Sequence, residues 1–216
     1  MISVIMPYYE RQAALDKSMG AWCAFYKNLD LEFSICDDGS PTPVIAYDCK
    51  VTTLPYKDHA LNPCVPINRA VEASSGNVLI LTNPEIVHRE PIVAFMLRQL
   101  DDEMDYVIAP CWDVTRERWL AHPLVKRDDT APIPEGSGLH FCAMFTRTLW
   151  DKAGGFDEDY REGQGYEDND WLWRAHKAGA RFKYSTGIVD HQKSTTRWPQ
   201  GGLSRNRKLF HAKWFP

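Results

Sequence analysis

The chain has 216 residues, 44% of them apolar, which is enough for one domain with a full hydrophobic core. Its formal net charge of −4, with both signs interspersed, argues against a nucleic-acid-binding surface. No leader peptide and no apolar run of about 18 residues is apparent, so neither secretion nor a membrane span is indicated. We expect a single-domain cytoplasmic protein whose six cysteines are reduced and mostly buried, because none has metal-like spacing.

The first half of the chain alternates predicted strands with predicted helices. Strands are expected over residues 2–7, 32–38, 44–51, 77–82 and 105–110, and helices over residues 11–27, 67–74 and 91–100. This alternation predicts an α/β fold with a Rossmann-like, mainly parallel sheet and right-handed crossovers. Such sheets bind ligands at the carboxyl ends of their strands.

The second half begins with residues 111–138, which mix charge with Pro and Gly and are expected to form a long excursion beside the site. The remaining predicted elements, in chain order, are a strand over residues 139–146, a helix over 147–154, a helix from Asp168, strands over 180–185 and 188–192, and a helix over 203–214.

Candidate binding residues follow the predicted strands of the first half. The stretch "DDGS" at residues 37–40 suits a nucleotide, because a carboxylate can accept from a base or ribose and Gly39 allows close approach, but Asp-Gly-Ser is also an ordinary turn. Glu85 follows a strongly apolar strand, where a hard divalent cation could use its oxygens. A lone Glu after a strand is more often simply solvated.

Two further features lie near the carboxyl terminus. His191 falls at another strand end, although a single His is more often structural than a ligand. The tail from Arg197 to Lys213 is locally basic and could be a solvated amphipathic helix, yet its Arg205, Arg207 and Lys208 would suit a diphosphate. Residues 198–202, with Trp-Pro and Gly-Gly, resemble a mobile lid.

The stretch "GYEDNDWLWRAHKAG" at residues 165–179 places three carboxylates ahead of an apolar helix. The helix dipole alone favours acidic residues there. Asp170 is spaced for an ordinary ion pair with Arg174, whereas Asp168 is in phase with the apolar positions and should point along the buried stripe. An inward carboxylate of this kind is either paired or used in chemistry. Neither a nucleophile elbow nor a P-loop nor a GxGxxG fingerprint is present, which argues against hydride transfer and ATP hydrolysis.

The order of these motifs resembles the family 2 glycosyltransferases of the GT-A fold over nearly the whole chain. The resemblance rests on "VIMPYYE", "ICDDGS", "NRAVEASSGNVLILTNPE" and above all "GGFDEDYREGQGYEDNDWLWRAHKAG", which is similar to the acceptor-side block of the galactosyltransferase and chondroitin-polymerase branch. It implies one catalytic domain over residues 1–216, with a nucleotide-sugar-binding half at 1–110 and a smaller acceptor-binding half, with the carboxyl-terminal lid and helix, at 111–216.

The resemblance also implies roles for individual residues. The nucleotide-sugar site would comprise Pro7, Tyr8, Glu10, Asp37, Asp38, Asn68, Asn83, Arg205 and Lys208. The family's Asp-x-Asp metal motif is replaced by Asn83-Pro84-Glu85, so the metal ligands would be Glu85 and His191, and a divalent cation held by them and by diphosphate oxygens would be Mn²⁺ rather than Mg²⁺.

On the acceptor side, Asp168 would be the general base, and Glu167, Trp171 and Gly165 would bind the acceptor, although the Trp could equally be core. The expected activity is inverting, metal-assisted transfer from a UDP-linked sugar to a saccharide or glycoconjugate in polysaccharide biosynthesis. Two alternatives stay open: a nucleotidyltransferase, for which no glycine-rich triphosphate loop is seen, and a catalytically weak sugar-nucleotide-binding module.

Overall fold

The computed structural model describes residues 1–46, 48–56, 62–125, 139–193 and 202–216. Its strands are β1 (Ile2–Tyr8), β2 (Leu31–Asp37), β3 (Lys50–Thr53), β4 (Val78–Thr82), β5 (Ile86–His88), β6 (Asp105–Ile108), β7 (Cys111–Asp113), β8 (Arg118–Ala121), β9 (Cys142–Thr146), β10 (Arg181–Tyr184) and β11 (Val189–His191). Its helices are α1 (Gln12–Tyr26), α2 (Cys64–Ala73), α3 (Ile92–Leu97), α4 (Arg147–Ala153), α5 (Glu167–Lys177), α6 (Gly202–Trp214) and the 3-10 helix η1 (Glu158–Glu162).

A seven-stranded sheet with the order β10-β6-β9-β4-β1-β2-β3 forms the centre of the molecule. All its neighbouring pairs are parallel except those of β9, which runs antiparallel between β4 and β6. Strands such as β1 and β4 are buried along nearly their whole length, as expected for strands covered on both faces. The predicted α/β fold with a mostly parallel sheet is therefore confirmed.

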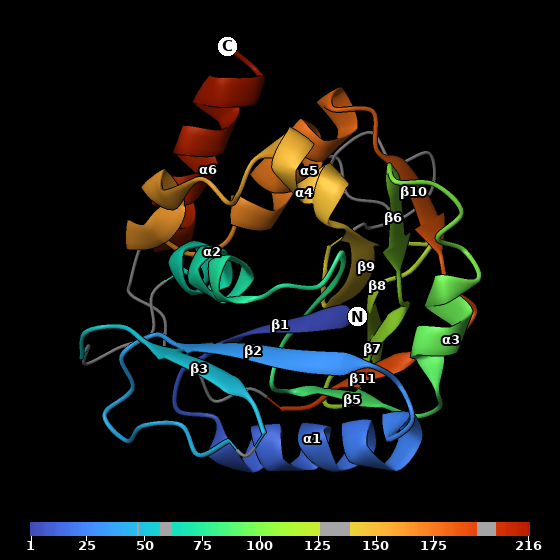
Figure 1. The fold of residues 1–216 in the computed structure, drawn as a ribbon. Coiled ribbons are helices and arrows are strands. Elements are labelled where there is room, and N and C mark those ends of the chain that lie inside the picture. Colours follow the sequence, from blue (N-terminus) through green and yellow to red (C-terminus); the bar gives the residue numbers. More distant parts are fainter. Residues whose placement is uncertain (47, 57–61, 126–138, 194–201) are drawn as a thin grey trace.

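Helices cover both faces of this sheet (Figure 1). Helix α2 lies against β1 and β2 on the side that also carries α4, α5 and α6, whereas α1 lies on the opposite side with β5. The hydroxyl of Ser18 in α1 donates to the carbonyl of Ile86 in β5 at 2.8 Å. The two helical layers thus enclose the sheet and leave its carboxyl edge for the site.

A second sheet of four short strands, with the order β5-β11-β7-β8, was not predicted. In it, His191 pairs in register with Asp113 of β7 and with Ile86 of β5. The first part of the expected excursion, up to residue 125, is the β7–β8 hairpin and the turn after it, and residues 126–138 lie outside the described residues. This small sheet carries His191 to the same edge as Glu85.

The predicted strand over residues 44–51 is wrong, because β3 begins only at Lys50. The amide of Val44 donates to the carboxylate of Asp37 at 3.0 Å, and that of Ile45 donates to the side-chain oxygen of Gln12 at 2.9 Å. These bonds to side chains replace the ladder that a strand would need.

The state of the cysteines agrees with the expectation from composition. All six cysteines are free, and Cys36, Cys64, Cys111 and Cys142 are buried. Among the described residues, none of the helices has both the length and the apolar character that crossing a bilayer requires.

Candidate functional site

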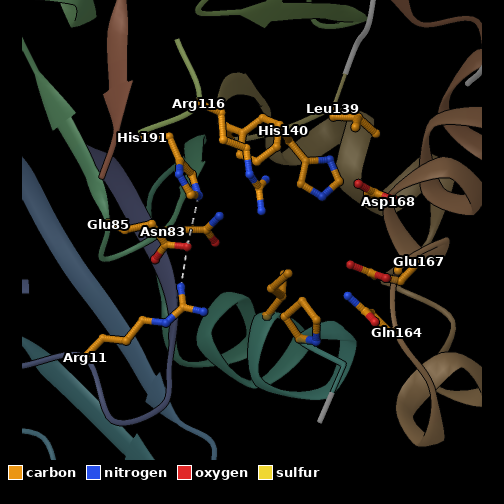
Figure 2. Close-up of a pocket in the computed structure, with 14 residues that line it drawn as sticks. Arg11, Asn83, Glu85, Arg116, Leu139, His140, Gln164, Glu167, Asp168 and His191 are labelled. Carbon is orange, nitrogen blue, oxygen red and sulfur yellow. Dashed lines mark ion pairs between the residues drawn. The ribbon is translucent and has the colours of Figure 1, made fainter. Parts of the chain in front are cut away.

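A cavity of about 450 Å³ opens at the carboxyl edge of β1 and β4 (Figure 2). This is the edge at which a sheet of this type binds its ligands. The residues lining it are Arg11, Pro63, Ile67, Asn83, Glu85, Arg116, Leu139, His140, Phe141, Gln164, Gly165, Glu167, Asp168 and His191. The cavity brings together six of the residues predicted from the sequence: Asn83, Glu85, Gly165, Glu167, Asp168 and His191.

One side of the cavity is a buried charge cluster. The guanidinium of Arg11, which follows β1, forms an ion pair with Oε1 of Glu85, which follows β4 (Figure 2). The Nε2 atom of His191 lies 3.5 Å from the same oxygen. Burial works to raise the pKa of Glu85, but His191 and Arg11 outweigh it and hold the pKa at about 2. Glu85 is therefore ionised at neutral pH.

The opposite side carries the carboxylates of Glu167 and Asp168 at the start of α5 (Figure 2). Gly165 and Tyr166 both have positive φ, 66° and 69°, so the chain turns sharply into the helix at this point. Asp168 is half-buried, and its Oδ1 accepts from the amide of Asn169 at 2.8 Å. Its place on the cavity wall agrees with its predicted inward direction.

Glu167 is buried, and its Oε2 accepts from the side-chain amide of Asn62 at 2.5 Å. Burial and the neighbouring charge of Asp168 raise the pKa of Glu167 well above its usual range. Glu167 therefore retains its proton at a higher pH than an ordinary glutamic acid does.

His140 and Arg116 lie between these two sides (Figure 2). The imidazole of His140 packs edge-on against Phe156 and Trp171, and burial lowers its pKa to about 3. It is thus a neutral group at physiological pH. Arg116 extends into the cavity from the turn after β7, where its Nη1 lies 3.6 Å from the carboxylate of Asp113.

Three residues of the cavity carry a buried polar atom with no hydrogen-bond partner among the described residues. These atoms are Oε2 of Glu85, Nδ1 of His140 and Nδ1 of His191. Buried polar atoms are normally paired, so these three atoms can form hydrogen bonds with water or with a polar ligand in the cavity. A carboxylate oxygen and imidazole nitrogens can form hydrogen bonds with hydroxyl groups.

The predicted base-binding residues form two turns that contact each other beside the cavity. The amide of Asp38 donates to the carbonyl of Tyr8 at 2.8 Å, and the amide of Glu10 donates to the hydroxyl of Ser40 at 3.0 Å. Asp37 is fully buried, and its carboxylate accepts from the amides of Ser40 and Val44. The side chain of Asp37 therefore stabilises its own turn, so "DDGS" has the role of an ordinary turn at this residue.

Asn68 and Trp171 hold the fold together instead of facing the cavity. The side chain of Asn68 exchanges two hydrogen bonds with the backbone of Phe156, at 2.9 and 2.7 Å, and donates to Glu158. Trp171 is fully buried, stacks on Phe156 and donates to the carbonyl of Gly154 at 2.8 Å. Trp171 is therefore a core residue, which was one of the two possibilities left open by the sequence.

Arg205 and Lys208 lie on α6, outside the residues that line the described cavity. Arg205 donates to the carbonyl of Asp159 at 2.9 Å and so ties α6 to η1. A diphosphate role for this helix stays a prediction. The predicted lid residues 198–201 lie outside the described residues, and Gly202 begins α6.

The described residues that line the cavity do not make a divalent-cation site by themselves. Glu85 is the predicted carboxylate ligand, but its Oε1 already forms an ion pair with the guanidinium of Arg11. The positive charge of Arg11 would repel a cation at this position. Within the described residues, no cluster of three or more His, Cys, Asp or Glu side chains is arranged to hold a metal ion.

No protein-family model and no curated protein matches the sequence. Among solved structures, S. aureus TarS 1–349 in complex with UDP-GlcNAc has a TM-score of 0.73 at 16% identity, with 98% of this chain and 66% of that chain covered. The mannosyltransferase PcManGT from Pyrobaculum calidifontis, in complex with GDP-Man and Mn²⁺, has a TM-score of 0.66 at 16% identity and is covered over 63% of its length by 98% of this chain.

The longer S. aureus TarS structure is covered over only 39% of its length, with a TM-score of 0.68. The chain thus spans between 39% and 66% of the solved structures to which it is similar. These likenesses show the fold, a central mixed sheet of the GT-A type flanked by helices.

Proposed function

We propose that this chain is an inverting glycosyltransferase that moves a hexosyl group from a nucleoside-diphosphate sugar, with UDP the expected nucleotide, to a saccharide or glycoconjugate in polysaccharide biosynthesis. One observation carries the proposal: the cavity at the ligand-binding edge of the fold sets cationic side chains against a pair of carboxylates (Figure 2). Similar structures in complex with UDP-GlcNAc and with GDP-Man support it.

The proposed reaction uses both sides of the cavity. The acceptor hydroxyl lies beside Asp168, which takes its proton as the acceptor oxygen attacks the anomeric carbon of the donor. The bond from that carbon to the diphosphate oxygen breaks on the opposite face, and the configuration inverts. Charge develops on the departing diphosphate, and the guanidinium groups of Arg11 and Arg116, which both line the cavity, stabilise it.

Glu167 positions the acceptor in this scheme. Its raised pKa leaves it protonated over a wider pH range, so that it can donate a hydrogen bond to a sugar oxygen while Asp168 accepts a proton. Asn62 fixes the Glu167 side chain, and Gly165 leaves room for the sugar at the backbone.

Several finer assignments remain proposals. Residues 1–110 are proposed to bind the nucleotide sugar, with the turns at Pro7–Glu10 and Asp37–Ser40 against the base and ribose, and residues 111–216 the acceptor. Divalent-cation assistance, with Mn²⁺ preferred to Mg²⁺, is expected from the family resemblance, whereas the ion pair of Arg11 with Glu85 argues against it.

The test is release of nucleoside diphosphate from a panel of UDP- and GDP-linked sugars in the presence of candidate saccharide acceptors. Asp168→Asn should reduce release about 10²- to 10⁴-fold, because the general base is lost, while nucleotide affinity stays near that of the wild type. Glu162→Gln, at an exposed carboxylate outside the cavity, is the matched control and should keep full activity. Tight nucleotide-sugar binding with no release from the wild type would establish a binding module instead.

A further inference from the structure

The ion pair between Arg11 and Glu85 joins two strand ends on the wall of the cavity. Arg11 follows β1 and Glu85 follows β4, and these strands are parallel neighbours in the sheet. Their side chains are only 17% and 6% exposed. A buried pair of this kind is costly to break, because removal of one partner leaves an uncompensated charge.

The same pair occupies the place where the family resemblance puts a cation. The first carboxylate of the Asp-x-Asp motif is Asn83 in this chain, and the remaining carboxylate, Glu85, is neutralised by Arg11. A second guanidinium, that of Arg116, also reaches the cavity wall. The positive charge that a diphosphate needs is thus present in protein side chains.

We propose that Arg11, held in place by Glu85, binds the diphosphate of the donor in place of a divalent cation, so that nucleotide binding does not require a metal. This inference rests on the proposed function. Arg11 contacts the donor directly, and Glu85 is a positioning residue that fixes the guanidinium.

Guanidinium chemistry suits this double task. The group carries five N–H donors in a rigid plane, so it can pair with a carboxylate on one edge and donate to an anion on another. Arginine binds phosphate oxygens in a bidentate manner, with charge-assisted hydrogen bonds that are stronger than those between neutral groups. The Oε2 atom of Glu85, which has no hydrogen-bond partner among the described residues, is then available to a donor-sugar hydroxyl.

The experiment measures binding of UDP and of GDP to the full chain by isothermal titration calorimetry, once in EDTA and once in excess Mn²⁺. We expect the nucleotide that binds to do so with similar affinity under both conditions. Arg11→Met should weaken binding in EDTA by about 10- to 100-fold, the loss expected for charge-assisted hydrogen bonds, and Arg11→Lys should restore part of it. Arg98→Met, at an exposed arginine of the α3 carboxyl end, is the control and should leave binding unchanged.

Glu85→Gln separates the two possible roles of the carboxylate. A metal ligand cannot be replaced by an amide without loss of nucleotide affinity, whereas a positioning carboxylate can, because glutamine still accepts a hydrogen bond from Arg11. Binding in EDTA should therefore persist in Glu85→Gln. If Arg11→Met alone does not fold, the double variant Arg11→Met with Glu85→Gln replaces it in the binding measurement, because it removes both charges together.

A direct measurement of Mn²⁺ binding gives a readout that is independent of nucleotides. By electron paramagnetic resonance, Arg11→Met, in which the Glu85 carboxylate has lost its counter-charge, should bind Mn²⁺ more tightly than the wild type does. Nucleotide binding that appears only with Mn²⁺ and disappears in Glu85→Gln would overturn the inference and leave the proposed function intact. Binding in EDTA that Arg11→Met does not weaken would also overturn it, and no UDP or GDP binding under either condition would overturn the proposed function as well.

Discussion

Asp168 and Asp170 lie two positions apart on one helical turn, yet their surroundings give them different tasks. Asp168 lines the cavity. Asp170 is fully buried and is paired with Arg174 at 2.9 Å and with Lys213 at 2.8 Å, while it also accepts from the indole of Trp214 at 2.9 Å. One carboxylate therefore joins α5 to α6, and the other remains accessible to a substrate.

At the same scale, Glu32 gives a pH-dependent prediction. It accepts from Ser3 at 2.5 Å and pairs with Lys50 at 2.7 Å, and it also accepts from the amides of Ser75 and Gly76. Burial works to raise its pKa, but these partners hold it at about 2, below the ordinary 4.5. Because the folded-state pKa is depressed, this stabilisation is complete above pH 4.5 and is lost as the pH falls towards 2.

Urea unfolding at a series of pH values tests this. Glu32→Gln should lower the free energy of unfolding at pH 7 by about 2 kcal/mol, and the difference from the wild type should shrink between pH 4.5 and pH 2. A difference that is independent of pH would show that the charge of Glu32 has no part in it.

Individual site residues were predictable where a motif singled them out. Asp168 could be identified from its phase with the apolar positions of α5, and Glu85 and His191 from their places at strand ends. Arg11 was assigned only to the start of a helix, and Arg116 only to the excursion. Arg11 follows β1 and Glu85 follows β4, and these two strands are parallel neighbours. Their ion pair could have been predicted from the sequence only if the order of the strands in the sheet had been known.

At the scale of elements, the link between α2 and β4 depends on a close approach at Gly76. A Cβ built there would lie 2.7 Å from the backbone nitrogen and 2.5 Å from the hydroxyl oxygen of Ser3. Gly76→Ala should therefore destabilise the fold by about 1 to 3 kcal/mol, because the backbone must shift. Gly20→Ala, inside α1 with nothing within 4 Å of the new Cβ, is the matched control and should stabilise by about 0.5 to 1 kcal/mol.

Thermal and urea unfolding of the two alanine variants provide the measurement. Opposite signs are expected, although the chemical change is the same. Equal effects would mean that the contact of Gly76 with β1 is relaxed without cost.

The elements α1, β1 and α5 were predicted to within a few residues, because β1 is a continuous apolar run and each helix is long enough to be recognised from its residue types. The three-residue strands β5, β7 and β11 were not identified as a sheet, since so few residues carry no measurable period and their pairing joins segments far apart in the chain. The strand predicted at 44–51 failed because the side chains of Asp37 and Gln12 compete for its backbone amides.

At the scale of the whole molecule, the two proposed halves share one sheet. Strand β6 lies within residues 1–110, but it is joined to β4 only through β9, which belongs to residues 111–216. We therefore predict that a fragment of residues 1–110 does not fold alone. Its urea unfolding curve should lack a cooperative transition, and co-expression with residues 111–216 should restore one. A cooperatively folding 1–110 fragment would show that the halves are independent domains.

The position of β9 also has a consequence for synthesis of the chain on the ribosome. When β6 has emerged, β4 and β6 are both present but neither has its common neighbour, which follows more than thirty residues later. During that interval two apolar strands expose unpaired backbone edges, the state in which a nascent chain pairs with other chains. The central sheet becomes continuous only when β9 inserts between β4 and β6. Folding of the newly made protein therefore cannot be completed before its second half has been synthesised.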